Sequence, residues 1–365
     1  MNPLLDAAPG PATNGEDGAI GTPVPLVFTG NGGEYFRIWI VNLALTILTL
    51  GIYSAWAKVR RLQYFYRNTA IAGASFDYHG DPKVILKGRV IGVLLLVAYQ
   101  LLGSFNVLAG LAAFLVLVAI LPWLLQRSLR FKLANSSYRG LHFQFAGRTG
   151  GAYQAFLLWP LAGYVTLGLL MPLAHREIKA YQHNHARFGD AAFAFSAKAG
   201  DFYRIYLKAL GMVLLILVGG GLLAAGSVAG MHAAFADAKP GREMLGAIMV
   251  AVMLLYLLVF LLITPWMAAR LQNLVWNHTT LLTHRIRSFV RARDLLWLYV
   301  SNFAAIVLTI GLYKPFADIR LARYRLTHTE LLVDGDLEGF LNARAQTVSA
   351  LGEETADVFN VDISL

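Results

Sequence analysis

Long runs without charged side chains dominate the hydropathy pattern of the chain. Six stretches contain no Asp, Glu, Lys or Arg: 38–57, 90–126, 149–174, 209–236, 244–269 and 295–313. A helix needs about 20 apolar residues to cross the hydrocarbon layer of a bilayer, so most of these stretches predict one membrane helix each. The stretch 90–126 is too long for one helix, and its Gly-Ser-Phe-Asn sequence at 103–106 is a natural turn. The pattern therefore predicts seven hydrophobic helical segments.

One motif recurs three times along the chain. It has the form Thr-x-Gly near the end of a hydrophobic segment, with a Tyr thirteen residues after the glycine and a cluster of basic residues around it. We call each copy, from its apolar helix through its basic run, a T-G module. The copies contain Thr49 and Tyr64, Thr166 and Tyr181, and Thr309 and Tyr324. Recurrence at this length predicts repeated structural units.

A second motif indicates that part of the chain is duplicated. A Pro-Trp pair is followed, after three other residues, by Arg127. A second Pro-Trp pair is followed at the same spacing by Arg270. The two copies are 143 residues apart, and Thr166 and Thr309 are separated by the same distance along the chain. Because two independent motifs keep one offset, we infer that a block at about 118–185 is duplicated at about 261–328.

The basic segments also contain short alternations of ring residues, as at Phe76 and Tyr78. A period of two predicts β-strands. Strands cannot lie bare in lipid, where their edge groups would be unpaired, so we expect a small sheet or hairpins at the membrane surface. The predicted fold is mainly α: a polytopic membrane helical bundle with internal repeats and short β-strands or hairpins at the surface. A disordered N-terminal tail at 1–22, a repeat-built transmembrane domain at 23–345 and a C-terminal tail at 346–365 complete the prediction.

Composition and charge bear on partners and topology. Only 14% of residues are charged, against about 25% in soluble domains. The net charge of +10 comes from residues that flank apolar stretches, so anionic lipid headgroups are the expected partner, and nucleic acid is not.

All the strand-bearing segments are basic. If every T-G module crosses the membrane, two of these segments are external; if each module dips in and returns, all lie on the cytoplasmic side. The positive-inside rule favours the second arrangement.

Few side chains are candidates for a functional site. Asn42 and Asn302 stand at equivalent places in the first and third T-G modules, with Thr49 and Thr309 near them. Buried amides predict an interhelical hydrogen bond or, alternatively, a paired polar site near the repeat axis. Basic residues beside aromatic ones predict either headgroup contacts or topological anchors. These residues are Arg60, Arg61, Arg67, Arg127 and Arg270.

Catalytic and metal chemistry have little support in the sequence. The chain contains no Cys, no G-x-S-x-G elbow, no P-loop and no H-E-x-x-H motif. His183 and His185 suggest a zinc site, but His185 occupies the place that Asn68 and Asn135 hold in other repeats. Asn and His both favour left-handed turns, so a turn residue explains the pattern better than a metal ligand. We therefore expect no enzyme activity, no metal and no cofactor.

The first T-G module carries a distinctive sequence. Its defining parts are residues 34–37, Asn42, 48–61, 64–69 and 76–80. Together they resemble the YjgN-like family of bacterial inner-membrane proteins, and the likeness covers about residues 24–345. The resemblance implies a multi-pass protein of the bacterial inner (plasma) membrane. That family is of unknown function, so the resemblance implies no activity.

Two function classes follow from these observations. The duplicated block and a Gly-rich apolar segment favour a transporter or channel for a small solute of unknown identity. The basic surface segments and the lack of charges within the apolar runs favour a lipid-binding or membrane-organising protein without transport. Transport predicts a polar cavity between repeats, whereas lipid binding predicts a dry bundle with basic surface clefts. Whether the chain forms a homo-oligomer stays open.

Overall fold

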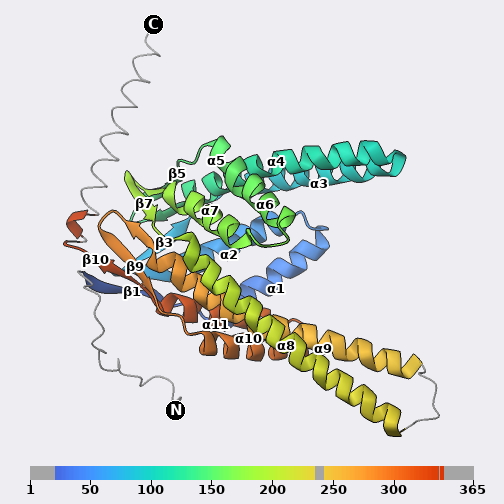
Figure 1. Cartoon of the computed structure of the whole chain (residues 1–365). Helices are drawn as coiled ribbons and strands as arrows, with labels where there is room; N and C mark the ends of the chain where they lie inside the picture. The colour runs from blue at the N-terminus through green and yellow to red at the C-terminus, as the bar shows by residue number, and fades with distance from the viewer. Residues whose placement is uncertain (1–20, 235–241, 337, 341–365) are drawn as a thin grey trace.

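The structure, a computed structural model, describes residues 21–234, 242–336 and 338–340. Apart from residues 21 and 22, the tails predicted at 1–22 and 346–365 lie outside the described residues. The described chain has two layers, a β-barrel at one end and a set of helices that extend from it (Figure 1).

The barrel, counted over the described residues, has ten antiparallel strands in the order β1-β10-β9-β8-β7-β6-β5-β4-β3-β2, and β1 pairs with β2 to close it. The strands are β1 (Thr22–Phe28), β2 (Thr69–Ile71), β3 (Ala74–Tyr78), β4 (Ser136–Tyr138), β5 (Leu141–Phe145), β6 (Ala186–Phe188), β7 (Ala191–Phe195), β8 (Thr279–Leu281), β9 (His284–Ser288) and β10 (Thr329–Val333). Strand β1 also pairs with β10, where Thr22 is opposite Val333, so the first and last strands of the barrel are neighbours.

This barrel shows that the predicted fold class was wrong. The surface hairpins expected on a mainly α bundle instead join edge to edge into one closed structure. A short hairpin has two unpaired edges, and each edge exposes backbone donors and acceptors. Neighbouring hairpins satisfy them, as where Phe76 pairs with Tyr138 and Phe143 with Phe188. Closure then leaves no free edge along the described strands.

The aromatic alternation that predicted the strands fills the barrel. Tyr138, Phe188 and Leu281 are buried together, and Phe76 and Phe143 pack against them. Tyr138 also donates a hydrogen bond of 2.7 Å from its hydroxyl to the carbonyl of Ile71. The barrel interior therefore contains an apolar core in which the hydroxyl of Tyr138 is hydrogen-bonded.

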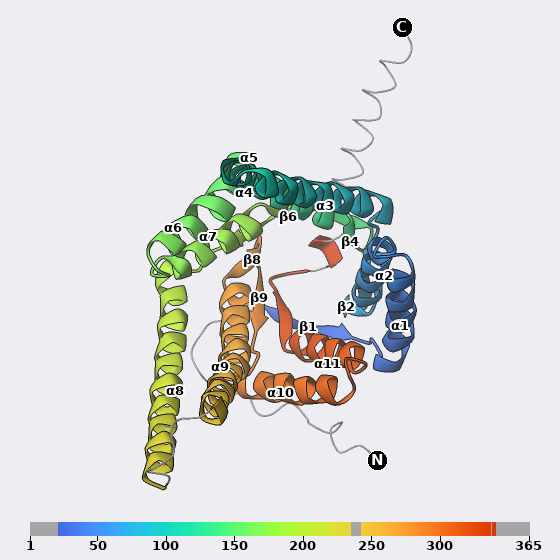
Figure 2. The same cartoon turned by 90° about the vertical axis from the view of Figure 1, so that its right-hand side faces the viewer.

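The helices form antiparallel pairs that leave the barrel and return to it. They are α1 (Gly32–Leu48), α2 (Ser54–Arg67), α3 (Pro82–Phe105), α4 (Val107–Ala134), α5 (Thr149–Tyr153), the π-helical segment η1 (Gln154–Leu158), α6 (Trp159–Val165), α7 (Met171–Asn184), α8 (Ala199–Ala234), α9 (Arg242–Asn277), α10 (Ala292–Leu308) and α11 (Lys314–Thr327). Each pair contacts the next, and α11 contacts α1, so the pairs make a ring (Figure 2).

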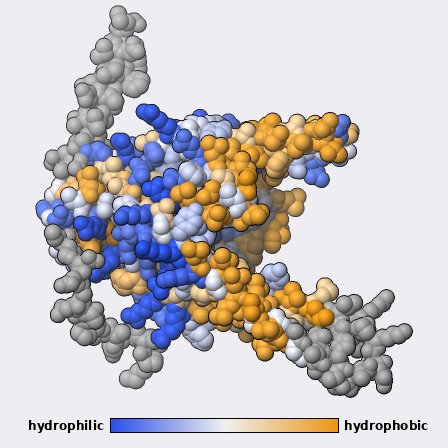
Figure 3. Space-filling view, in the orientation of Figure 1, coloured by the Kyte–Doolittle hydropathy of each residue, from blue (hydrophilic) through white to orange (hydrophobic). Residues whose placement is uncertain are grey.

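Two of these pairs are long enough to cross a membrane. By length and composition, four helical segments of the described chain qualify as spans: Pro82–Phe105, Val107–Ala134, Ala199–Leu223 and Ile248–Asn277. They form two apolar arms that project away from the polar barrel end (Figure 3). The remaining predicted segments belong to the T-G modules and do not qualify.

The T-G modules are short hairpins that return to the barrel. Among the described residues, their turns carry the most exposed large apolar side chains, with Leu50, Leu167 and Ile310 at 95%, 98% and 94% exposure. Exposed leucine and isoleucine side chains at a turn are expected where the end of a hairpin enters the lipid and the chain then returns to the same side. The strands before and after each module belong to the same barrel. All the strand-bearing segments therefore lie at the same end of the molecule.

Candidate functional site

The threonine of the Thr-x-Gly motif connects both helices of a T-G hairpin. The hydroxyl of Thr309 donates to the carbonyl of Ala305 at 2.7 Å and accepts from the N–H of Tyr313 at 2.9 Å. Thr49 and Thr166 make the same pair of bonds. One side chain thus caps the end of the first helix and the start of the second. Thr49 and Thr309, predicted as polar site candidates, have this structural role.

The glycine of the motif completes the turn. Leu50 has a φ of 49° and Gly51 a φ of 91°, and the other two modules repeat these values closely. The N–H of Gly51 then reaches back to the carbonyl of Thr46 at 2.8 Å, as in a Schellman cap. Only glycine takes that φ without strain, which explains its presence in every copy.

The two predicted amides lie in separate hairpins. Asn302 is buried, and its Oδ1 accepts a hydrogen bond of 2.7 Å from Arg320. Asn42 is buried as well, but its Oδ1 has no partner among the described residues. No hydrogen bond joins one amide to the other, since the bonds of the Asn302 side chain go to α11 of its own hairpin.

The repeated tyrosine closes the barrel end of each hairpin. The hydroxyl of Tyr324 accepts from the N–H of Arg291 at 3.0 Å and donates toward Asp294 at 3.3 Å. Tyr64 bonds in the same way to Asn31 and Glu34. Burial, the largest effect, raises the pKa of Tyr324, so its hydroxyl stays protonated at neutral pH.

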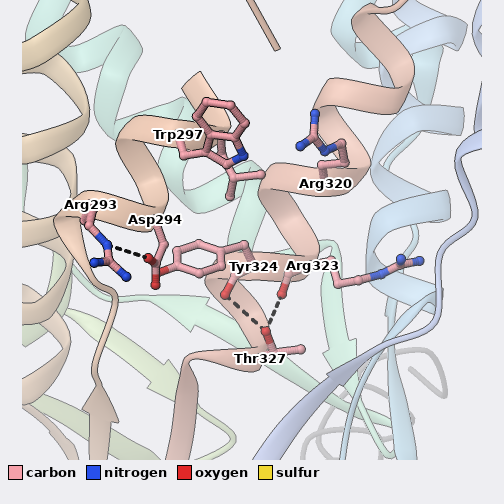
Figure 4. A pocket seen from close by; sticks show the side chains of 8 residues that line it. Arg293, Asp294, Trp297, Arg320, Arg323, Tyr324 and Thr327 are labelled. Carbon is pink, nitrogen blue, oxygen red and sulfur yellow. Dashed lines mark hydrogen bonds and ion pairs between the residues drawn. The ribbon is translucent and has the colours of Figure 1, made fainter. Parts of the chain in front are cut away.

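A pocket of about 630 Å³ opens beside Tyr324, between α10 and α11. Its lining residues are Arg293, Asp294, Trp297, Leu298, Arg320, Arg323, Tyr324 and Thr327 (Figure 4). They come from the barrel-proximal part of both helices. We call this cavity the α10–α11 pocket.

The α10–α11 pocket carries a net positive charge. Three arginines, Arg293, Arg320 and Arg323, line it together with one carboxylate, that of Asp294. Arg293 lies 3.7 Å from Asp294 and is 93% exposed, while Arg323 donates to the carbonyl of Gly30 at 2.7 Å. Trp297 adds a ring that is 67% exposed. An anion with an apolar attachment matches this combination of charges and ring.

An equivalent pocket of about 450 Å³ lies 143 residues earlier, between η1 and α7. Tyr181 takes the place of Tyr324, and Gln154 that of Trp297. Glu177 stands where Arg320 stands and pairs with Arg176 at 2.6 Å. Duplication has thus kept the cavity and changed its charge. The equal offset could have located this pair of cavities, but of their lining residues the sequence motifs contain only Tyr324, Tyr181, His185 and the arginines of the basic runs.

The basic residues predicted to contact headgroups lie outside both pockets. Arg61 and Arg67 pair with Asp318 and Asp77, at 3.6 and 2.8 Å. The other three guanidinium groups lie over rings: Arg60 over Tyr53 at 5.8 Å, Arg127 over Trp123 at 5.0 Å and Arg270 over Trp266 at 6.0 Å. Such cation–π contacts fix the side chains near the tryptophans and tyrosines that typically lie at membrane interfaces.

Of the two histidines that suggested zinc, His185 caps a helix, whereas Nδ1 of His183 lies 3.2 Å from the hydroxyl of Thr279. Nδ1 of His185 bonds to the carbonyl of Tyr181 at 2.9 Å, and Asn68 bonds to Tyr64 in the same way. The backbone there has a φ of −107° at His185 and −92° at Asn68, so the expected left-handed turn was wrong. Among the described residues no group of three or more His, Cys, Asp and Glu side chains is placed to hold a metal.

Comparison with known proteins shows the family of the chain. Residues 23–358 match a family described as a bacterial protein of unknown function (DUF898). The inner membrane protein YjgN of Salmonella typhimurium is 26% identical over 354 residues, which cover 86% of this chain and 89% of the relative. YjgN of Escherichia coli O157:H7 is 28% identical over 156 residues, 42% of this chain and 39% of that protein. No solved structure matches. With its candidate spans and these relatives, the chain is an inner-membrane protein, and it belongs to the DUF898 family.

Proposed function

We propose that the protein binds anionic phospholipids of the inner membrane through the α10–α11 pocket, and that it does so without transporting a solute. The observation that carries this proposal is that Arg293, Arg320 and Arg323 line one cavity together with one carboxylate and an exposed tryptophan. Guanidinium groups bind phosphate oxygens in bidentate fashion. Tryptophan favours the headgroup level of a bilayer.

The position of the pocket supports a lipid as its ligand. Arg293 is near the start of α10 and Thr327 ends α11, so the cavity is at the barrel end of the hairpin. Ile310, at the other end of the same hairpin, is 94% exposed. A phospholipid could therefore place its phosphate among the arginines and its acyl chains along the apolar hairpin.

Solute transport has less support. The interior of the barrel is filled by residues such as Tyr138 and Phe188. The helix pairs all leave and re-enter one barrel, so the repeats lack the inverted arrangement that many transporters use. A packed barrel with basic clefts around it favours binding over conduction.

The test compares two exposed arginines. In detergent without phospholipid, short-chain phosphatidylglycerol and phosphatidylcholine are titrated into the wild type, Arg293→Glu and Arg285→Glu, with calorimetry as the readout. Arg285 lies on the exposed barrel surface, outside the α10–α11 pocket, so its variant has the same charge change. We expect preferential binding of phosphatidylglycerol, weakened about tenfold by Arg293→Glu and little by Arg285→Glu. Equal affinity in all three proteins, or no preference for the anionic lipid, would overturn the proposal.

A further inference from the structure

The cavity of about 450 Å³ between η1 and α7 is lined by charged side chains of both signs. We call it the η1–α7 pocket. Arg148 and Arg176 line it together with one carboxylate, that of Glu177. Gln154 and Asn184 add two neutral amides. A ligand that matches this lining carries a negative and a positive charge, whereas the three arginines of the α10–α11 pocket match an anion.

The charges of the η1–α7 pocket stand at different positions from those of its duplicate. The three arginines of the α10–α11 pocket correspond, 143 residues earlier, to Gly150, Glu177 and Ala180. Arg176, by contrast, corresponds to the apolar Ile319. The earlier copy has thus lost every arginine that lines the later cavity and has gained charges of its own. We therefore treat it as a site with a different ligand.

The hairpin places an aromatic ring and a carboxylate at opposite positions. Trp159 and Glu177 stand where the third T-G module has Asn302 and Arg320. Those two side chains are hydrogen-bonded at 2.7 Å, so the two positions face each other across that hairpin. In the second module Trp159 is partly buried, and it lines the cavity together with Glu177. A ring face and a carboxylate both attract an ammonium ion.

An ion pair fixes both charges at the wall of the pocket. Nη1 of Arg176 donates to Oε1 of Glu177 at 2.6 Å, and Nε of Arg176 donates to the carbonyl of Ala197 at 3.3 Å. The two charged side chains are partly buried, with 32% and 26% exposure. A guanidinium group has five N–H donors and a carboxylate has two oxygens, so each can still bind a ligand group of the opposite charge. The pair can therefore bind a phosphate and an ammonium of one ligand side by side.

The backbone beside this pocket differs from that of the other T-G hairpins. Helices α1 and α10 are α-helical throughout, whereas the second hairpin contains η1. There the N–H of Trp159 bonds to the carbonyl of Gln154, five residues earlier. A π-turn changes the direction of the side chains around it, and such turns are frequent at functional sites. Gln154 and Trp159, the two ends of this bond, both line the pocket.

We infer that the η1–α7 pocket binds a phosphodiester that carries a primary ammonium group, which is the chemistry of a phosphatidylethanolamine headgroup. Arg148 and Arg176 bind the phosphate, and Glu177 and Trp159 bind the ammonium. A primary ammonium donates hydrogen bonds to a carboxylate, whereas the quaternary ammonium of choline has no N–H to donate. The site is separate from the α10–α11 pocket and does not depend on binding there.

The place of the pocket favours a membrane lipid as the source of this group. Arg148 caps the start of α5 and His185 caps the end of α7, so the cavity is at the barrel end of the second hairpin (Figure 1). Leu167, at the tip of the same hairpin, is 98% exposed. A headgroup in the pocket would leave acyl chains free to lie along the apolar hairpin.

The experiment uses the full-length protein in phospholipid-free detergent. Short-chain phosphatidylethanolamine and phosphatidylcholine are titrated into the wild type, Glu177→Gln and Glu338→Gln, with calorimetry as the readout. Glu338 lies outside both pockets and pairs with Arg139 at 2.6 Å, so the control variant also loses the charge that pairs with an arginine. We expect the wild type and the control to prefer phosphatidylethanolamine about tenfold, and Glu177→Gln to lose this preference while it still binds phosphatidylcholine.

Two soluble probes identify the source of the ligand and its charged groups. Glycerophosphoethanolamine has the same headgroup without acyl chains. Affinity equal to that of the lipid indicates a free ligand, and much weaker binding indicates a membrane lipid. Alanine is a zwitterion without phosphate and should not displace the lipid.

A cross-linking measurement on the wild type avoids dependence on the folding of a variant. A carbodiimide activates carboxylates, which then form an amide with an amine in contact with them. With phosphatidylethanolamine bound, mass spectrometry should find the lipid adduct on Glu177 in clear excess over Glu338, although Glu338 is 61% exposed.

Several results would overturn the inference. These are a wild type without preference for phosphatidylethanolamine, an unchanged preference in Glu177→Gln, equal weakening of both lipids by that variant, displacement by alanine, or equal adducts on Glu177 and Glu338. None of them bears on the α10–α11 pocket, whose test uses phosphatidylglycerol and Arg293→Glu.

Discussion

Arg320 donates a hydrogen bond of 2.7 Å to the buried side-chain oxygen of Asn302. The first T-G module contains the same two residue types in the same places, Arg60 and Asn42, without that bond. There the guanidinium lies over the ring of Tyr53 at 5.8 Å, and the oxygen of Asn42 has no partner in the described chain. The first and third modules therefore share these two residue types but not the hydrogen bond between them.

This difference predicts unequal effects when each amide is replaced by leucine. Asn302→Leu removes the acceptor of a charged donor that is partly buried, and should lower the free energy of unfolding by about 1–3 kcal/mol. Asn42→Leu removes an oxygen that is already unpaired, and should be close to neutral. Unfolding of the detergent-solubilised protein by a denaturing detergent measures both. Equal losses in the two variants would contradict the contact pattern.

The cap at the hairpin tip gives a second prediction. Thr49→Val removes the group that accepts from the N–H of Tyr53 and leaves that donor unpaired at an apolar tip. We expect a loss of about 1–3 kcal/mol in unfolding free energy, because lipid offers no replacement partner. Thr46 is a matched control, since its hydroxyl only donates to the carbonyl of Asn42. Thr46→Val should cost clearly less, and a cost as large as that of Thr49→Val would argue against the double cap.

Sequence patterns identified the repeats because these are local and periodic. Thr49, Gly51 and Tyr64 recur at fixed spacing, and each has a structural role that requires that residue type. The barrel was missed because half of its hairpin strands, such as β2 and β4, have only three residues, too few to show a period. Its closure also joins Thr22 to Val333, a contact that no local pattern contains.

The candidate site was only partly accessible to the same reasoning. Asn302 was identified as a buried polar residue, yet its partner Arg320 was seen only as part of a basic run. Arg293 and Trp297 lie outside the recurring motif and meet Arg320 only when α10 and α11 fold together. Residue spacing within one helix contains no information about contacts between α10 and α11. The sequence analysis therefore selected arginines beside aromatic residues, and these lie outside the α10–α11 pocket.

A partly buried histidine, His183, predicts how stability changes with pH. Burial, followed by the charge of Lys179, lowers the pKa of His183 to about 4, against about 6.5 in an unfolded chain. The unfolded chain therefore gains a proton below about pH 6.5 that the folded protein does not take up until about pH 4. Stability should fall as pH falls through this window, by at most about 1.4 kcal/mol per pH unit for one proton.

His175 has the same lowered pKa, about 4, so the two residues should contribute together. Melting of the wild type, His183→Asn and His175→Asn/His183→Asn is compared between pH 7 and pH 5. We expect the slope to decrease in the single variant and further in the double variant. His142→Asn, at an exposed position on the barrel, serves as the control. A slope that stays the same in the double variant would refute the assignment.

The single barrel also predicts the membrane topology. The chain contains no Cys, so single cysteines can be introduced without background labelling. Ser75 and Thr283 are exposed on barrel hairpins, whereas Ser104 is exposed at the turn between α3 and α4. Helices α3 and α4 qualify as membrane spans, whereas the T-G hairpins return to the barrel, so we expect Ser75→Cys and Thr283→Cys to lie on one side and Ser104→Cys on the other. By the positive-inside rule, the excess of Lys and Arg near the barrel predicts that this side faces the cytoplasm. An impermeant maleimide should therefore label only Ser104→Cys in intact cells with a permeable outer membrane, and all three after lysis. If T-G modules crossed the bilayer, Ser75→Cys and Thr283→Cys would differ in labelling, and the barrel could not form.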